Sequence, residues 1–325
     1  MSSIRPQHLV TPPAMNFNSS QQMWLHAMRL RTLPLSVAGI LVGNALAWRL
    51  DAFHWQIALL SLSTAMLLQI VANLANDYGD GMNQADAQDR QGPVRITASG
   101  LVTPARMLCV VLLACALTIV SGLALLGATW QIHGQINWSF WIALGSLSLV
   151  AALAYTVGAK PYGYRSLGDL AVLIFFGFVA VLGAVMLQVN HLQSLKHYPL
   201  YFASLAIGLW SVAVLNLNNM RDIESDARHG KITVAVRLGL RRAVRYQQTL
   251  ILVASLSWFA VLYDSLLSTP AYLLMGLGLW FLWRQLSFPW LQASAVRYTQ
   301  ELQKLSRDVL IQVLVFTGFL TYFSN

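Results

Sequence analysis

The sequence is short of charge and of cysteine, and both shortages exclude classes of protein. Charged residues make up 10% of the 325 residues and hydrophobic residues 57%, whereas soluble globular domains carry about 25% charged residues. This balance nearly excludes a soluble enzyme, and it excludes a disordered or collagen-like chain. The two cysteines, Cys109 and Cys115, lie in one apolar run and are too few for a disulfide framework or a zinc site.

The N-terminal segment lacks the features of a secretory leader. Residues 1–22 are polar and hold no apolar core with a small-residue cleavage site behind a basic start. We therefore expect a polar N-terminal tail over 1–22 without a cleavable signal peptide. The remainder, 23–325, is expected to form a single transmembrane domain.

Long apolar runs follow this tail, and a bilayer-spanning helix needs about 20 such residues. We expect nine spans, all helical because lipid offers no partner for open backbone groups. They cover approximately 33–50, 54–75, 107–128, 139–157, 167–188, 198–219, 248–264, 266–283 and 308–323. The predicted fold class is an all-α integral membrane protein.

Basic residues are distributed unevenly between the loops. The net charge of +9 would suggest nucleic acid on a soluble protein. On an apolar chain it favours membrane lipid as the partner, and we expect no nucleic acid. If the N-terminus is cytoplasmic, all of the 21 Lys and Arg residues except Arg49 and Lys196 fall in cytoplasmic segments. This bias predicts that orientation.

Two of the expected cytoplasmic loops, about 76–106 and 220–247, are long and rich in Asp, Asn, Arg and Gly. They contain seven of the twelve acidic residues, namely Asp77, Asp80, Asp86, Asp89, Asp222, Glu224 and Asp226. Long loops in compact domains are usually functional or disordered. The regular polar spacing of these loops favours a function.

Each acidic group ends an expected helix and contains an Asn-x-x-x-Asp spacing. Residues three or four apart lie on one side of a helix. The sets that share a face in this way are Asn73, Asp77 and Asp80 in one group and Asn218, Asp222 and Asp226 in the other. Stacked carboxylates repel each other unless a cation lies between them, and oxygen ligands suit Mg²⁺ or Mn²⁺ rather than zinc. One such Asp would indicate a solvated helix end, whereas two matched groups favour a metal site.

The two acidic groups end the second and sixth expected helices, four spans apart, which suggests an internal repeat. A four-helix unit used twice, followed by a ninth helix, would place both groups on the same side above one central cavity. A structure with the groups on opposite flanks of the bundle would refute this expectation.

Basic residues accompany the acids. The candidates for neutralising a metal-bridged diphosphate are Arg95, Lys160, Lys231 and Arg237. The positive-inside bias alone would also place bases here, so each one could be topological rather than catalytic. Arg29 and Arg31 precede the first span, and either could bind a carboxylate bidentately or anchor the chain at the membrane surface.

Taken together, these segments resemble the UbiA superfamily of intramembrane prenyltransferases, and within it the branch that acts on 1,4-dihydroxy-2-naphthoate. The matching segments are Arg-x-Arg-Thr-Leu-Pro-Leu (29–35), Asn-Leu-Ala-Asn-Asp-Tyr-Gly-Asp (73–80), Asp-Arg-x-Gly-Pro (89–93), Tyr-Thr-Val-Gly and Pro-Tyr-Gly-Tyr (155–164), Leu-Gly-Asp (167–169), Asn-Asn-Met-Arg-Asp-Ile-x-Ser-Asp (218–226) and Gly-Lys-x-Thr-x-Ala-Val-Arg-Leu-Gly (230–239). Leu30 departs from the family's usual Pro, and the chain after about 245 is hardly diagnostic. The resemblance implies a nine-helix bundle around a central cavity.

The resemblance also implies three groups of site residues. For the metal, Mg²⁺ with Mn²⁺ as an alternative, these are Asp77, Asp80, Asp222 and Asp226, assisted by Asp86. For the leaving diphosphate they are Asn73, Arg95, Asn218, Asn219, Lys231 and Arg237, with Lys160 among the catalytic residues. For the aromatic acceptor they are Arg29, at the substrate carboxylate, and Tyr155, which would shelter the allylic cation.

The implied reaction joins polyprenyl diphosphate to 1,4-dihydroxy-2-naphthoate with loss of CO₂, giving demethylmenaquinone for menaquinone biosynthesis. The implied location is a bacterial inner membrane, with the site facing the cytoplasm. Other acceptors, such as 4-hydroxybenzoate or homogentisate, would keep the mechanism. A divalent-cation transporter is a different class. Transporters place acids near the bilayer midplane, whereas these acids lie at helix ends beside bases that would repel a bare cation.

Overall fold

The computed structural model describes residues 19–82, 92, 95–189, 197–265 and 270–323. Its described elements are helical, and one isolated bridge pairs Arg165 with Ile232. The first half consists of α1 (Ser20–Met28), η1 (Leu30–Thr32), α2 (Leu33–Arg49), α3 (Trp55–Met82), α4 (Pro104–His133) and α5 (Trp138–Ala154). The second half consists of η2 (Tyr162–Tyr164), α6 (Gly168–Val172), the π-helical η3 (Leu173–Val179), α7 (Ala180–Val189), α8 (Tyr198–Arg221), α9 (Ile223–Arg228), α10 (Val234–Ser265), α11 (Pro270–Ser287), η5 (Trp290–Gln292) and α12 (Ala295–Phe323).

The expected all-α fold with long apolar helices is confirmed. Seven described segments are long and apolar enough to cross a membrane: Ser20–Arg49, Trp55–Met82, Pro104–His133, Gly168–Val189, Tyr198–Arg221, Val234–Tyr263 and Ala295–Tyr322. The other two expected spans correspond to α5, an apolar helix of 17 residues, and to α11. The count of nine spans and the side of the N-terminus stay predictions. The expected tail over 1–22 lies mostly outside the described residues, and α1 already begins at Ser20.

Helix ends follow local chemistry. The helix α4 starts where the side chain of Thr103 accepts a hydrogen bond from the Arg106 amide, with Pro104 at the first turn. It ends at Gly134, whose φ of 70° is the left-handed conformation that glycine adopts without strain. The helix α10 is kinked at Gly239, where a φ of 69° separates residues 234–238 from the rest of the helix.

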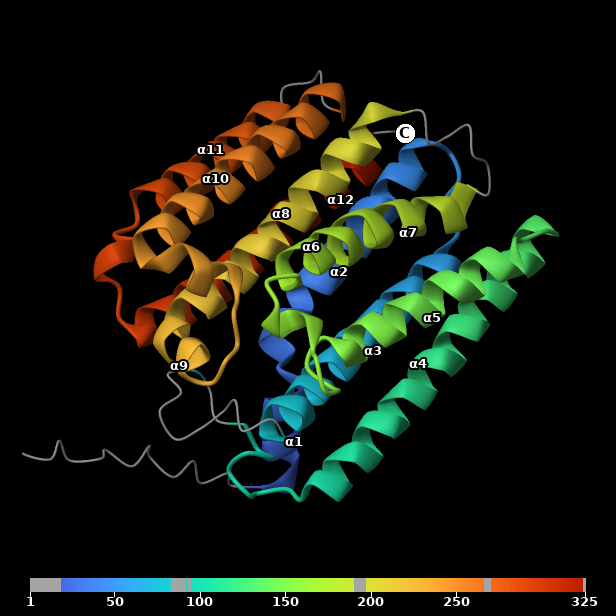
Figure 1. Cartoon of the computed structure of the whole chain (residues 1–325). Helices are drawn as coiled ribbons and strands as arrows, with labels where there is room; N and C mark the ends of the chain where they lie inside the picture. The colour runs from blue at the N-terminus through green and yellow to red at the C-terminus, as the bar shows by residue number, and fades with distance from the viewer. Residues whose placement is uncertain (1–18, 83–91, 93–94, 190–196, 266–269, 324–325) are drawn as a thin grey trace, which may run out of the picture.

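The most buried helix is α8, which packs against α10, α12 and η3 (Figure 1). Its Trp210 contacts Trp258 of α10 and Phe281 of α11, with ring centroids 5.6 and 5.7 Å apart, and Trp258 in turn contacts Phe316 of α12. This aromatic layer joins the C-terminal helices into one core. Helix α2 packs closely against α7 because Gly39 and Gly43 of α2 have no side chain.

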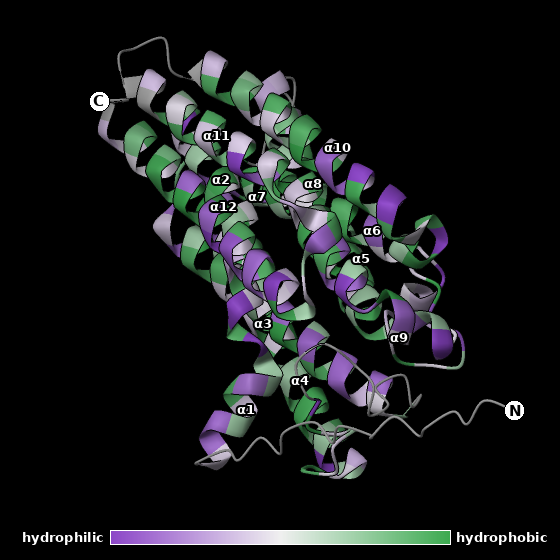
Figure 2. Cartoon of the chain, turned by 90° about the vertical axis from the view of Figure 1, so that its left-hand side faces the viewer, coloured by the Kyte–Doolittle hydropathy of each residue, from purple (hydrophilic) through white to green (hydrophobic). Residues whose placement is uncertain are grey.

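The outer helices expose apolar side chains, and Figure 2 colours much of the helical ribbon as hydrophobic. On α4, Leu112, Leu113 and Val120 are 60%, 59% and 65% exposed. An exposed apolar surface of this extent suits lipid rather than water.

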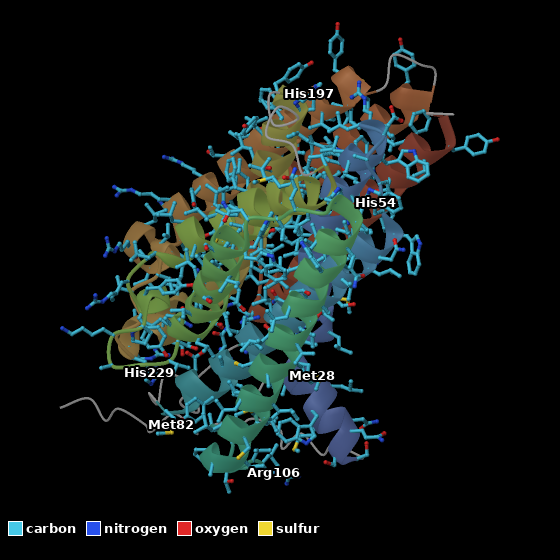
Figure 3. All side chains as sticks on the ribbon, turned by 90° about the vertical axis from the view of Figure 1, so that its right-hand side faces the viewer. Met28, His54, Met82, Arg106, His197 and His229 are labelled. Atoms are coloured by element: carbon cyan, nitrogen blue, oxygen red, sulfur yellow. The ribbon has the colours of Figure 1, made fainter. Side chains whose placement is uncertain are left out.

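Figure 3 places Met28, Met82, Arg106 and His229 toward one end of the bundle and His54 and His197 toward the other. The ends of α1, α3 and α9 therefore share one end.

Candidate active site

A cavity of about 730 Å³ lies within the bundle, lined by α2, α3, α4, α5, η3, α7 and α8. Most of its wall is apolar, with side chains such as Leu68, Leu123, Phe175 and Phe176. Its polar lining includes residues of the two acidic motifs and of the segments near them: Arg29, Asn73, Asn76, Asp80, Arg95, Asn218, Asn219 and Lys231. Residues of both motifs reach this cavity, Asp80 from the first and Asn218 and Asn219 from the second, whereas Asp222 and Asp226 are not among the side chains that line it. The expectation that both acidic groups lie over one central cavity stays a prediction.

The first motif supplies a buried ion pair. Asp80 is fully buried near the end of α3 and pairs with Arg95. The hydroxyl of Tyr164 donates a hydrogen bond of 2.6 Å to the other oxygen of Asp80. Both oxygens of this carboxylate are therefore held in fixed directions at the cavity wall.

Asp77 is equally buried but has different contacts. Its two carboxylate oxygens accept hydrogen bonds from the backbone N–H groups of Ile96 and Thr97, at 3.1 and 2.9 Å. These bonds fasten the segment that follows Arg95 to α3. Asp77 is not among the side chains that line the cavity. Its expected role as a metal ligand stays a prediction, and these contacts offer the alternative that Asp77 instead places Arg95.

Close packing fixes the loop after α5 against α3. A side chain at Gly79 would bring a Cβ within 2.6 Å of the Thr156 carbonyl oxygen, so only glycine allows this approach. The Thr156 hydroxyl donates hydrogen bonds to the carbonyl of Ala75 and to Asn76. Asn76 lines the cavity one helical turn before Asp80.

The second motif has a matching set of buried charges. Arg221 donates two hydrogen bonds to the neighbouring Asp222, at 2.9 and 2.6 Å. It also donates to Asn218 at 2.7 Å and to Thr299 of α12 at 3.2 Å. Asp226 lies 3.5 Å from the ammonium group of Lys231, which is 5.6 Å from the centre of the Tyr164 ring. Tyr164 thus links the two motifs.

Three acids of the site each pair with a base. Asp80 pairs with Arg95, and the other pairs are Asp222 with Arg221 and Asp226 with Lys231. Buried carboxylates are costly unless they are paired in this way or bind a cation. A divalent cation at the acids would release the bases to bind an anion, which is the arrangement that a metal-bound diphosphate needs.

The oxygen donors fit Mg²⁺, which prefers carboxylate and amide oxygens. Among the described residues, no three His, Cys, Asp or Glu residues come close enough together to hold a metal by themselves. Mg²⁺ typically takes one or two carboxylates and completes its shell with water and substrate phosphates. Asp86, the expected assisting ligand, lies outside the described residues.

Two further expected residues line the same cavity. Tyr155 contacts Tyr162 edge-on at 5.4 Å. Arg29 ends α1 in the left-handed conformation, with a φ of 51°.

Of four further expected residues, two lie in the cavity wall and two lie outside it. Asn73 and Asn219 are buried in the cavity wall, and Asn73 donates hydrogen bonds to Met28 and Thr32. Lys160 and Arg237 are exposed and are not among the side chains that line the cavity. Their expected roles stay predictions.

Three site residues were not expected from the sequence: Asn76, Tyr164 and Arg221. Asn76 precedes Asp80 by four residues, the same Asn-x-x-x-Asp spacing that selected Asn73, so the spacing contained the signal. Arg221 is adjacent to a selected Asp and is hidden among the many bases of its loop. Tyr164 lies 84 residues from Asp80 in sequence, and only the fold brings them together.

The fold and site together define a class: a helical membrane protein whose apolar cavity is lined by paired acids and bases. A model of the UbiA prenyltransferase family matches residues 36–301. The chain therefore belongs to the UbiA prenyltransferase family.

Two curated relatives are similar to this chain over most of its length. The 1,4-dihydroxy-2-naphthoate octaprenyltransferase of Escherichia coli (strain K12) is 45% identical over 234 residues, which cover 72% of this chain and 74% of the relative. The Mycobacterium tuberculosis protein of the same name is 41% identical over 255 residues, covering 78% of this chain and 80% of the relative.

Solved structures share the fold. A UbiA homolog from Archaeoglobus fulgidus, bound to GPP and Mg²⁺, matches with a TM-score of 0.60 at 13% identity, covering 91% of this chain and 99% of that one. The apo structure of a UbiA homolog from Aeropyrum pernix K1 matches with a TM-score of 0.60 at 17% identity, covering 92% of this chain and 98% of that one. At these identities the likeness concerns the fold alone.

Proposed function

We propose that this protein transfers a polyprenyl group from polyprenyl diphosphate to 1,4-dihydroxy-2-naphthoate in menaquinone biosynthesis. A carbon–carbon bond forms between the prenyl chain and the ring while the diphosphate leaves and CO₂ is lost. The product is demethylmenaquinone in its quinol form. The names of the curated relatives support this acceptor. The observation that carries the proposal is an apolar cavity whose lining includes Asp80 of the first motif and Asn218 and Asn219 of the second.

Asp80 of the first motif and Asp222 and Asp226 of the second would hold Mg²⁺ with no more than two carboxylates on one ion. Amide oxygens from Asn76 and Asn219, together with water and diphosphate, would complete its shell. The bound metal would supply positive charge to the leaving diphosphate. Arg95 and Lys231 add positive charge to the same anion, because each is buried beside an acid that would turn to the metal. Asn73 and Asn218 support the diphosphate site from the cavity wall.

Breaking the allylic C–O bond leaves positive charge on carbon, which apolar walls protect from water. The neutral ring of Tyr155 can stabilise this charge by a cation–π contact. Arg29 would bind the acceptor, whose electron-rich ring attacks the cation. A polyprenyl tail can remain among apolar side chains such as Phe175 and Phe176 while its head lies near Asp80.

We place the protein in a bacterial inner membrane with nine spans and a cytoplasmic N-terminus. The segments beyond the seven long apolar helices would be α5 and α11, each crossing with a shorter apolar stretch. The distribution of Lys and Arg supports a site that faces the cytoplasm.

The test is to incubate the purified protein with 1,4-dihydroxy-2-naphthoate, a polyprenyl diphosphate and Mg²⁺, with 4-hydroxybenzoate in a parallel reaction. Mass spectrometry would identify the products. We expect a prenylated, decarboxylated naphthoquinol that EDTA abolishes and added Mg²⁺ restores. Product from 4-hydroxybenzoate alone would overturn the choice of acceptor. Undiminished product in EDTA would overturn the metal site.

A further inference from the structure

The short helix α6 begins with Gly168 and Asp169, which have no part in the site described above. Gly168 packs against the cavity wall from behind, because a Cβ added there would lie 3.1 Å from the Tyr155 hydroxyl oxygen and 3.5 Å from Leu215. Both of these side chains line the cavity, whereas Gly168 and Asp169 are not among the residues that line it. Val172, about one turn after Asp169, lines the cavity again. Asp169 therefore lies directly behind the wall that Tyr155 forms.

Asp169 is a buried acid that forms no ion pair with a base among the described residues. It is 8% exposed, and its carboxylate accepts one side-chain hydrogen bond, of 3.0 Å, from the Tyr246 hydroxyl of α10. The acids Asp80, Asp222 and Asp226 differ, because each forms an ion pair with a base. A buried carboxylate held by a neutral donor is costly unless a cation comes near it. The carboxylate of Asp169 therefore favours a positive charge close by in the cavity.

The proposed reaction produces such a charge on the other side of this wall. The allylic carbon becomes positive when the diphosphate leaves with the electron pair of the C–O bond. Arg95 and Lys231 face the diphosphate in this reaction and do not balance Asp169. A carboxylate behind the Tyr155 ring adds negative potential to the face that a cation approaches. Because Coulomb attraction acts over several ångströms where water is excluded, Asp169 needs no contact with the substrate.

We propose that Asp169 stabilises the allylic cation through the ring of Tyr155 and that Tyr246 holds the Asp169 carboxylate in place. The inference rests on the proposed function and adds a positioning residue to it. Asp169 forms no bond to the substrate and takes no proton, so its charge alone lowers the barrier to breaking the C–O bond. Loss of this charge should weaken binding of a cation and leave binding of the neutral prenyl chain unchanged.

The experiment compares two unreactive ligands of equal shape, 3-aza-2,3-dihydrogeranyl diphosphate and 2,3-dihydrogeranyl diphosphate. The first carries a protonated nitrogen where the allylic cation has part of its charge, and the second carries a neutral carbon there. Calorimetry with Mg²⁺ would measure both dissociation constants, with detergent micelles as the blank and the melting temperature of each protein measured alongside.

The variants separate charge from contact. Asp169→Asn removes the charge but keeps an oxygen that accepts the Tyr246 hydrogen bond, whereas Tyr246→Phe removes the hydrogen bond and keeps the charge. Asp169→Ala is a second neutral variant, which tests the charge if Asp169→Asn does not fold. Asp51→Asn is the matched control, because Asp51 is an exposed acid that does not line the cavity.

We expect the wild type to bind the aza ligand more tightly than the carbon ligand, and both neutral variants to lower this preference about tenfold. Tyr246→Phe and Asp51→Asn should keep the preference. Equal weakening of both ligands by the neutral variants, weakening of neither, or loss of the preference in Tyr246→Phe alone would overturn the proposal and leave Asp169 a structural contact between α6 and α10.

The same preparations are assayed for prenyl transfer to 1,4-dihydroxy-2-naphthoate, so that the two proposals fail separately. A wild type that prefers the aza ligand through Asp169 but forms no naphthoate product would overturn the proposed acceptor and leave the role of Asp169 standing. A wild type that binds neither ligand would overturn the prenyl diphosphate site and this inference with it.

Discussion

Asp77 and Asp80 lie one turn apart on α3, and a paired substitution separates their roles. The Asp77 carboxylate accepts backbone hydrogen bonds from Ile96 and Thr97, whereas Asp80 lines the cavity. In Asp77→Asn one carboxylate oxygen becomes an NH₂ group, which cannot accept, so one buried backbone donor loses its partner. We therefore expect the substitution to loosen the segment that carries Arg95.

A buried donor left without a partner costs about 1–3 kcal/mol, which corresponds to about a 5- to 140-fold loss of the ordered arrangement. The prenyl-transfer rate should fall within that range. The Mg²⁺ concentration for half-maximal activity should stay the same, because Asp77 would act through the backbone and not on the metal. Asp80→Asn should instead raise the Mg²⁺ requirement, since it removes a ligand charge.

The assay is the initial rate of product formation over a Mg²⁺ titration, with the thermal stability of each variant measured alongside. Asp51→Asn is the matched control, because Asp51 is an exposed acid that does not line the cavity. A rise in the Mg²⁺ requirement of Asp77→Asn equal to that of Asp80→Asn, at unchanged stability, would refute the positioning role and make Asp77 a metal ligand.

Three further predictions concern the walls of the site. Tyr164→Phe removes the 2.6 Å hydrogen bond to Asp80 and should lower the prenyl-transfer rate about tenfold; an unchanged rate would show that this bond is dispensable. Gly79→Ala would place a methyl group 2.6 Å from a loop carbonyl oxygen, whereas Gly127→Ala meets nothing within 4 Å. Thermal melting should therefore fall for the first and not for the second, and equal melting temperatures would contradict the packing. Burial raises the pKa of Tyr162 to about 12, so the folded state retains a proton that the unfolded chain loses near pH 10. The stabilisation from this group is complete below about pH 10 and is lost as the pH rises toward 12. Denaturation profiles of Tyr162→Phe should show a smaller loss over this interval, and a parallel loss would contradict the assignment.

Helix positions were predictable because a lipid-facing helix leaves a long apolar run in the sequence. The final helix was predicted too short, at 308–323, whereas α12 begins at Ala295. The reason is a set of ion pairs that sequence hydropathy cannot register. Arg284 of α11 contacts both Glu301 and Asp308 of α12, at 3.4 and 2.7 Å, so charged residues remain inside the packed helix.

The site was predictable where local spacing decides which residues meet. Residues of both acidic motifs reach one cavity because each motif ends a helix at the same end of the bundle. Contacts between segments distant in sequence could not be predicted, such as that of Tyr164 with Asp80 or of Arg221 with Thr299. Which bases belong to the site could not be predicted either, because all arginines of a loop look alike in the sequence. The fold buries Arg95 and leaves Arg237 exposed.

The π-helical winding of Leu173–Val179 sets the orientation of the residues that follow it in the helix. If the same residues wound as a regular α-helix, which turns about 100° per residue, everything after them would be rotated about the helix axis. The rotation would carry Ala180 and Ala184 away from Gly39 and Gly43, where they now pack. It would also turn Val179 away from the cavity that it lines. A homologue that lacks one residue in this segment should therefore wind it as a regular α-helix and keep the packing at Gly39 and Gly43.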